Sequence, residues 1–349
     1  MSGLMKFDFG NEKKFVEFVK GISRKDKVAL ISHTDLDGIA AAKIANEILK
    51  SHFVKFVNYD QIAQPLVEEL KREGVNKIVF TDLYIKHEEF ILALEEFAEV
   101  LIMDHHLADR DWNSKRTTFV KIEEGYCAGY LCYVLFSKIK DIEYLDWLAA
   151  CSCVSDYCHI KPAAWLESVF EKYGDSFEQV GRYVRTSGVM WDLQETFSLA
   201  IIYFKDDLKS FFDKVSSDFG DLGELKVCAD EVRQEVEHFV NLFEKKKEAF
   251  PDGYLFEFNP NFRCGSIVGT IISGKYEHKT VITLRFDPEK KMYGMSGRRQ
   301  DKKVNMNDFL KKLVEGFERS EAGGHVAAAG GLFPAKYLAE FKNRLGVVS

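Results

Sequence analysis

The feature that most constrains this fold is the alternation of short apolar segments with helical patterns over the first 110 residues. The apolar segments, which are rich in Val, Ile and Phe, are Val28–Ser32, Phe53–Asn58, Lys77–Thr81 and Val100–Met103. Between the first two segments, residues 38–51 place apolar side chains at helical spacing. Continuous apolar strands separated by helices indicate a parallel sheet covered by helices on both faces. The sequence therefore predicts an α/β fold for this part of the chain.

Composition agrees with a packed protein. The chain has 349 residues, of which 46% are hydrophobic and 30% charged, so it is too apolar for a disordered protein. The longest nearly apolar run, residues 127–136, is about half the length that a membrane span requires, and we expect no membrane association. The first ten residues lack the apolar core of a secretion signal, and the seven cysteines are irregularly spaced. We therefore expect a cytoplasmic protein without a disulfide framework.

The rest of the chain predicts a helical region followed by a second, smaller α/β domain. Residues 126–156 indicate two buried helices, and residues 160–250 are mostly helical by period. A charged stretch, residues 231–247, is expected to form an exposed connecting helix, and Pro251-Asp252-Gly253 breaks it. Beyond this break we expect strands over 254–258, 280–286 and 292–296, and helices over 265–273 and 305–317. The predicted domains are residues 1–215, a helical linker of 216–250, and residues 251–349.

Charge is distributed unevenly along the chain. The net charge is −7, which argues against a protein that lives mainly on long duplex DNA. Residues 251–349, however, carry 16 Lys and Arg against 11 Asp and Glu. The acidic part of the chain, residues 1–250, can hold metal ions, and the mildly basic part, residues 251–349, can hold phosphate. Two ordinary solvated surfaces would give the same asymmetry.

Acidic and histidine side chains follow three of the four predicted strands. The sequence His33-Thr34-Asp35-Leu36-Asp37-Gly38 follows the first strand, Asp82 follows the third, and Asp104-His105-His106 follows the fourth. The carboxyl ends of parallel strands share one edge of a sheet, where such folds place their ligand sites. Asp156 comes later, at the expected end of a buried helix. The sequence therefore predicts a cluster of carboxylates and imidazoles at this edge.

A single Asp after a strand is usually a helix cap or a turn residue, but the whole set has another explanation. Several carboxylates brought together repel one another, and a pair of divalent cations removes this conflict. Carboxylates with imidazoles suit manganese, magnesium or zinc, and the lack of thiolates argues against a structural zinc site. Asp35 and Asp37 are two residues apart, so in an extended stretch both would face the cluster, and Gly38 would permit a sharp entry to the helix.

A second group of candidate residues lies near the C-terminus. Gly323-Gly324-His325 is followed by small residues as far as Gly331, which predicts a loop that bares backbone N–H groups to an anionic oxygen. Upstream, Arg298 is expected just after a strand, where it can bind phosphate bidentately. The alternatives are a flexible glycine turn and an exposed basic turn.

Three other signals are discounted. Residues 269–275 resemble a phosphate-binding loop, but Tyr276 replaces the required hydroxyl residue. Cys151, Cys153 and Cys158 have poor spacing for zinc and are read as small hydrophobic residues. The aromatic residues of 160–215 are read as helical core rather than as a base-stacking surface.

Taken together, the motifs resemble those of the DHH phosphoesterase superfamily with its associated C-terminal domain. His33-x-Asp35-x-Asp37-Gly38, Asp82, Asp104-His105-His106 and Asp156 are similar to its four motifs in order, and Gly323-Gly324-His325 is similar to the signature of the associated domain. The short first motif is more similar to archaeal RecJ-like members than to bacterial RecJ, whose His lies further ahead of the Asp pair. The match extends from about residue 28 to 331, nearly the whole chain.

The resemblance implies a two-metal site in a cleft between two domains. One metal ion would be held by His33, Asp35 and Asp82, and the other by Asp37, Asp82, His105 and Asp156, with Asp82 bridging. The resemblance also implies catalytic roles for Asp104, whose carboxylate would orient an imidazole, and for His106, which would face the substrate phosphate. Substrate binding would fall to Arg298, Gly323, Gly324 and His325.

The function that the resemblance implies is a manganese-dependent phosphodiesterase, with magnesium as the other candidate metal. The first choice of substrate is short single-stranded RNA or DNA, degraded to mononucleotides as by RecJ-like nucleases or nanoRNases. The alternatives are a 3′-phosphoadenosine 5′-phosphate phosphatase and a phosphodiesterase for linear or cyclic dinucleotides. A non-catalytic RecJ-like partner of a helicase or replication factor is the competing class, and a catalytic nuclease with such a partner also stays open.

Overall fold

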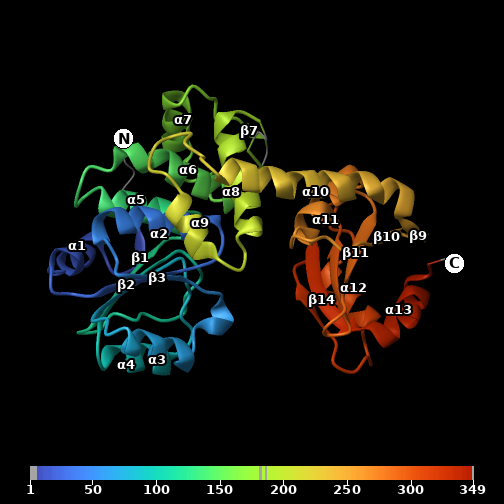
Figure 1. Cartoon of the computed structure of the whole chain (residues 1–349), viewed down its shortest axis with the longest axis horizontal. Coiled ribbons are helices and arrows are strands. Elements are labelled where there is room, and N and C mark those ends of the chain that lie inside the picture. Colours follow the sequence, from blue (N-terminus) through green and yellow to red (C-terminus); the bar gives the residue numbers. More distant parts are fainter. Residues whose placement is uncertain (1–5, 181–182, 185–186, 348–349) are drawn as a thin grey trace. The chain divides into compact units, whose positions relative to one another are not determined.

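The computed structural model describes residues 6–180, 183–184 and 187–347. The chain forms two compact units, Met1–Ala229 and Asp230–Ser349, and each contains a six-stranded sheet (Figure 1). The mixed α/β fold class predicted from the sequence is confirmed.

The sheet of the first unit has the strand order β1-β6-β5-β4-β2-β3. Its strands are β1 Phe7–Phe9, β2 Val28–Ser32, β3 Phe53–Phe56, β4 Lys77–Thr81, β5 Glu99–Asp104 and β6 Thr117–Ile122. Strands β2 to β6 are mutually parallel, and β1 pairs antiparallel with β6. All four predicted strands are present, with β3 two residues shorter than expected, and the parallel sheet is confirmed.

Strands β1 and β6 were not predicted. Strand β6 contains two Thr and one Lys in six residues, so its apolar signal is weak. Lys121 of β6 is nevertheless only 2% exposed, because its ammonium group pairs with Asp8 of β1. A strand that contains a buried ion pair of this kind cannot be predicted from apolar runs in the sequence.

Helices cover both faces of this sheet (Figure 1). Helices α3 Gln64–Arg72 and α4 Glu88–Glu95 pack on one face, where their Leu, Val, Ile and Phe side chains share a core with alternate residues of β2, β4, β5 and β6. Helices α1 Glu12–Lys20, α2 Leu36–Leu49 and α5 Ala128–Phe136 contact the other face. Helix α6 Asp146–Ser155 packs against α2 and α5, so residues 126–156 form two buried helices as predicted.

The remainder of the first unit is mostly helical, as expected. Its elements are α7 Ala163–Lys172, β7 Gln179–Val180, β8 Tyr183–Val184, α8 Val189–Tyr203 and α9 Leu208–Lys214, together with the short 3-10 helices Tyr59–Gln61 and Glu143–Leu145. Helix α10, Leu225–Lys246, begins at the end of the first unit and belongs mainly to the second. The stretch 231–247 is not exposed throughout as we expected, because Val232, Val236, Val240 and Phe243 form one buried stripe.

The sheet of the second unit has the order β13-β14-β12-β11-β10-β9. Its strands are β9 Glu248–Phe250, β10 Gly253–Glu257, β11 Thr280–Asp287, β12 Met292–Arg298, β13 Glu321–Gly324 and β14 Ala328–Pro334. Only β10 and β11 pair in parallel. The glycine-rich segment that we expected to be a loop is instead the β13–β14 hairpin, because its small residues fit a tightly paired edge of the sheet.

The helices of the second unit are α11 Gly265–Lys275, α12 Met306–Leu313 and α13 Leu338–Leu345, with a 3-10 turn at Ala335–Tyr337. Helices α12 and α13 share one core with the sheet. Residues 269–275 lie within α11, so they form no phosphate-binding loop. Among the described helices, none combines the length and the apolar character that crossing a membrane would require.

Phe80 provides a test of how the first unit is held together. It lies in the middle of β4, is fully buried, and packs edge-on against Phe90 of α4. Truncation to Ala leaves a cavity between the sheet and α4, so Phe80→Ala should lower the free energy of unfolding by about 3–5 kcal/mol. All four tryptophans lie between residues 112 and 191, so tryptophan fluorescence during denaturant titration follows this unit alone. Leu92→Ala, at an exposed position of α4, is the control and should change the stability little.

Candidate functional site

The first motif forms the connection between β2 and α2. Asp35 is the N-cap of α2, and its Oδ1 accepts a hydrogen bond from the backbone N–H of Gly38 at 3.0 Å. Asp37 lies in the first turn of the helix rather than in an extended stretch. The expectation that Asp35 and Asp37 face the cluster because they alternate along an extended chain is therefore wrong. Both side chains still reach the site, but from a cap position and from a helical turn.

Gly38 permits a close approach that any side chain would prevent. A Cβ atom at this position would lie 2.6 Å from the carbonyl oxygen of His33 and 2.8 Å from its Cβ. The first turn of α2 therefore packs directly on His33. This contact fixes His33 at the end of β2, as part of the edge where the parallel strands end.

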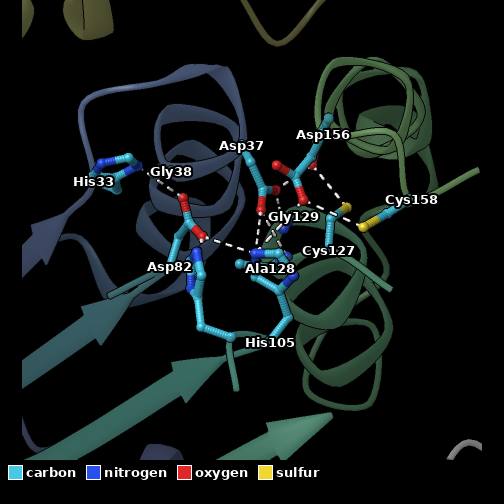
Figure 2. Close-up of polar contacts among 12 residues, drawn as sticks. His33, Asp37, Gly38, Asp82, His105, Cys127, Ala128, Gly129, Asp156 and Cys158 are labelled. Carbon is cyan, nitrogen blue, oxygen red and sulfur yellow. Dashed lines mark hydrogen bonds and ion pairs between the residues drawn. The ribbon is translucent and has the colours of Figure 1, made fainter. Parts of the chain in front are cut away.

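Asp82 lies at the centre of the site. Its backbone has a φ of 59°, in the left-handed region, and its N–H donates to the carbonyl of Met103 at 3.0 Å. The side chain is buried, yet neither carboxylate oxygen accepts a hydrogen bond from the described residues. Instead, Oδ2 lies 3.5 Å from Nδ1 of His33, and Oδ1 lies 3.2 Å from Nε2 of His105 (Figure 2). Asp82 thus stands between two imidazoles.

Each imidazole faces further carboxylates. Nδ1 of His33 is 2.9 Å from Oδ2 of Asp35. Nε2 of His105 is 3.6 Å from Oδ2 of Asp37 and 3.6 Å from Oδ2 of Asp156, which follows α6 (Figure 2). Ligands that bind one divalent cation at about 2.1 Å lie about 3.0–3.4 Å from one another, so these separations are close to those of a coordination shell.

Burial and mutual repulsion perturb the acids of this site. Burial and the charge of Asp37 raise the pKa of Asp82 well above its usual range. The same two causes raise the pKa of Asp156 to about 6. Burial by itself would lower the pKa of His33, but its contacts with Asp35 and Asp82 raise this pKa to about 10. The site therefore contains more negative charge than the imidazoles neutralise.

Asp37 is held by groups that the sequence did not reveal. The backbone N–H of Ala128 donates to Oδ2 at 2.9 Å, and that of Gly129 donates to Oδ1 at 2.7 Å. Both amides belong to the first turn of α5, and Ser152 of α6 donates a further hydrogen bond. The positive end of a helix stabilises a carboxylate in this way. The sequence of an apolar helix gives no sign that its backbone amides bind a carboxylate.

A hydrogen-bonded chain borders the cluster. Oδ1 of Asp104 is 2.8 Å from Nδ1 of His106, and Nε2 of His106 is 3.0 Å from the hydroxyl of Tyr59. Burial alone would raise the pKa of Asp104, but the contact with His106 lowers it, so this acid stays ionised. Tyr59 lies after β3 and also packs against the ring of His33. Sequence reasoning missed Tyr59, because it followed the acids and histidines after the strands and not the phenol side chains.

The donor set of this edge fits divalent cations. Two groups of donor atoms, from His33, Asp35 and Asp82 and from Asp82, His105 and His106, are each compact enough to hold an ion. A third such group joins His105 and Asp156 to Cys158. The carboxylate of Asp82 accepts no hydrogen bond from the described residues and faces imidazoles at 3.2 and 3.5 Å, so its burial is costly unless positive charge lies beside it.

The other predicted residues lie together in the second unit. Arg298 is the last residue of β12 and pairs with Ala328 of β14, and its guanidinium donates to the hydroxyl of Ser266 at 2.7 Å. Gly323 and Gly324 end β13, and the exposed His325 begins the hairpin turn. Gly324 has a φ of 144°, and a Cβ there would lie 2.6 Å from the chain at Ala329. Arg298 and the hairpin tip therefore share one end of this sheet.

Comparison with solved structures shows the fold. Exonuclease RecJ bound to manganese matches with a TM-score of 0.63 at 14% identity, over 99% of this chain and 95% of that chain. CDC45 from Entamoeba histolytica matches with a TM-score of 0.62 at 11% identity, over 97% and 99%. The pGpG-specific phosphodiesterase PggH from Vibrio cholerae matches with a TM-score of 0.52 at 12% identity, over 91% and 97%.

These likenesses show that the chain has a RecJ-like fold, as the resemblance of the motifs implied. At the level of sequence, neither a protein-family model nor a curated protein matches the chain. Identities this low show a shared fold but not a shared activity, so the function must be inferred from the residues of the site itself.

The central position of Asp82 leads to a test of metal binding. Mn²⁺ at a hundred times its dissociation constant should stabilise the protein by about 2.7 kcal/mol, and Asp82→Asn should abolish this stabilisation. Asn is preferred to Ala because it tolerates the left-handed backbone of residue 82. The variant should keep its fold, because the amide matches the carboxylate in size and its loss of the ion pairs with His33 and His105 is offset by relief of the repulsion from Asp37.

The measurement is the thermal unfolding temperature with and without Mn²⁺, followed by tryptophan fluorescence. Asp60→Asn, which changes an exposed acid next to Tyr59, should leave the metal-induced shift intact. An equal shift in wild type and Asp82→Asn would exclude Asp82 as a metal ligand.

Proposed function

We propose that this protein is a metal-dependent phosphodiesterase that degrades short single-stranded oligonucleotides to mononucleotides. The observation that carries the proposal is the carboxylate of Asp82, which is buried without a hydrogen bond and faces two separate sets of imidazole and carboxylate donors. One set is His33 with Asp35, and the other is His105 with Asp37 and Asp156. A carboxylate shared between two such sets is the arrangement that a two-metal hydrolase requires.

The ligands we propose are those that the motifs implied. His33, Asp35 and Asp82 would hold one divalent cation, and Asp37, Asp82, His105 and Asp156 the other. When bound, the pair of ions supplies an activated water and neutralises charge on the phosphoryl oxygens. Manganese is the metal we propose first and magnesium second.

Asp104, His106 and Tyr59 handle the substrate phosphate beside the ions. Asp104 binds Nδ1 of His106 and thereby fixes the orientation of the ring. Nε2 of His106 and the half-exposed hydroxyl of Tyr59 then form one polar surface next to Asp82. We propose that these two groups bind phosphoryl oxygens and hold the scissile bond in line, which contributes orientation.

The second unit supplies the remaining substrate contacts in this proposal. Arg298 binds a phosphate, and the backbone amides of Gly323 and Gly324 and the ring of His325 bind the adjacent part of the nucleotide end. The mild excess of Lys and Arg over residues 251–349 suits a few phosphates rather than a long strand. We therefore propose short oligonucleotides rather than long ones as the substrate.

All seven cysteines are free thiols, which supports the proposed cytoplasmic location.

Two enzymatic alternatives share the same chemistry. A dinucleotide phosphodiesterase agrees with the likeness to the pGpG-specific enzyme, and a 3′-phosphoadenosine 5′-phosphate phosphatase would use the same metal ligands. The competing non-catalytic class agrees with the likeness to CDC45, and a helicase or replication factor would then be the partner. Every acid of the four motifs is present in this chain, which favours an enzyme.

The experiment that tests the function is one reaction panel with Mn²⁺. RNA and DNA ladders labelled at either end are incubated with the protein beside pGpG, cyclic dinucleotides and 3′-phosphoadenosine 5′-phosphate. We expect stepwise release of mononucleotides from one end of short single strands, and no turnover with Asp82→Asn. Cleavage of the small nucleotides alone would support the alternatives. Absence of any hydrolysis by a metal-loaded protein would contradict the proposal and favour the non-catalytic class.

Arg298 offers a test of substrate binding that leaves the metal ligands intact. A charge-assisted hydrogen bond is worth about 1.5–3 kcal/mol, so Arg298→Ala should raise KM roughly 10- to 100-fold. The effect on kcat should be smaller, because Arg298 contacts the substrate in both ground and transition states. Steady-state kinetics on a labelled short oligonucleotide give both constants. Lys290→Ala, in the turn at the other end of the β11–β12 hairpin, is the matched control, and an equal effect of both variants would contradict the role of Arg298.

A further inference from the structure

Cys158, which we expected to be a small hydrophobic residue of a buried helix, lies beyond the end of α6 and beside the proposed metal centre. Its Sγ donates to Oδ2 of Asp156 at 3.2 Å (Figure 2). The same carboxylate oxygen is 3.6 Å from Nε2 of His105. One donor atom from each of the three residues lies within 4.8 Å of the other two, so sulfur, oxygen and nitrogen surround a single position.

The backbone after α6 turns so that Cys158 and Asp156 are on the same side. Tyr157 has a φ of 56°, in the left-handed region that bulky residues rarely adopt. The N–H of Cys158 then donates to the carbonyl of Cys153 at 2.9 Å, which returns the chain to the last turn of the helix. The thiol is therefore held next to Asp156 by the fold.

A second observation directs a cation to this position. The carboxylate of Asp82 is 1% exposed, and both of its oxygens lack a hydrogen bond. Its Oδ1 is 3.2 Å from Nε2 of His105, the nitrogen that also faces Asp156. This buried carboxylate faces the imidazole that also faces Asp156, so it adds negative charge beside the group around Cys158, which favours a cation there.

We propose that Cys158 is a direct ligand of the cation held by His105 and Asp156, and that it makes this position selective for thiophilic divalent ions such as Zn²⁺ and Co²⁺. The inference rests on the proposed metal centre and deepens it. Sulfur ligands favour these ions over Mn²⁺, whereas the position at His33, Asp35 and Asp82 offers only nitrogen and oxygen. The two positions would thus bind different metals.

Ligation replaces a proton by the metal ion. The S–H bond of Cys158 breaks, the proton passes to solvent, and the sulfur–metal bond forms, with no change of oxidation state. The hydrogen bond from Sγ to Asp156 is the contact that the metal would replace.

The test is titration of the full-length protein with Co²⁺, followed by absorption spectroscopy. A thiolate bound to Co²⁺ gives a charge-transfer band in the near ultraviolet, which oxygen and nitrogen ligands do not give. We expect this band in wild type and in Cys228→Ser, which changes another half-buried cysteine of the first unit. Cys158→Ala should bind Co²⁺ without the band. Loss of a direct ligand should also reduce the preference for Zn²⁺ over Mn²⁺, measured by competition, by roughly tenfold or more.

The outcomes separate this inference from the proposed function. Binding of Co²⁺ without a charge-transfer band in wild type, or with a band that persists in Cys158→Ala, overturns the role of Cys158 and leaves the metal centre intact. Failure of wild type to bind any divalent cation overturns both. If circular dichroism shows that Cys158→Ala is unfolded, Cys158→Ser becomes the deciding variant. We expect Cys158→Ser to lose the charge-transfer band as well.

Discussion

The structure depends on a group of carboxylates that the sheet forces together at one edge. Parallel strands β2, β4 and β5 end side by side, and each is followed by an acid within a few residues. Asp37 and Asp82 are buried close enough for the charge of one to raise the pKa of the other. Such an arrangement costs free energy in the folded chain. A cation bound at this edge, as we propose, would offset this cost.

The surrounding elements reduce this cost in different ways. Helix α5 directs two backbone amides at Asp37, and α2 packs on His33 through Gly38. His33 lies at one carboxylate oxygen of Asp82 and His105 at the other, while the charge of Asp104 is paired with His106. The helices on this face of the sheet thus stabilise the charged side chains of the site and also form part of the hydrophobic core. Their packing and the chemistry of the site depend on the same contacts.

Much of this could be predicted from the sequence, because strand ends in a parallel sheet converge whatever the side chains are. The four strands, the two buried helices and the gathering of the acids followed from periodicity and position. What could not be predicted depends on contacts across the fold. Tyr59 and Cys158 reach the site through local turns, and the amides of Ala128 and Gly129 have no side-chain signature. The extended geometry expected for Asp35 and Asp37 was wrong because a cap forms there, and the glycine loop is a hairpin because small residues also suit close strand pairing.

The N-terminal strand β1 has a consequence of another kind. It pairs antiparallel with β6 from Phe7 to Phe9 and places Asp8 on Lys121. Without it, β6 would present unpaired backbone groups along the margin of the sheet, together with an unneutralised lysine that is now buried. Exposed margins of this kind recruit strands from other molecules. These few residues, which include no proposed ligand, therefore cover an edge of the sheet and neutralise a buried charge, and we expect a chain without them to self-associate more readily.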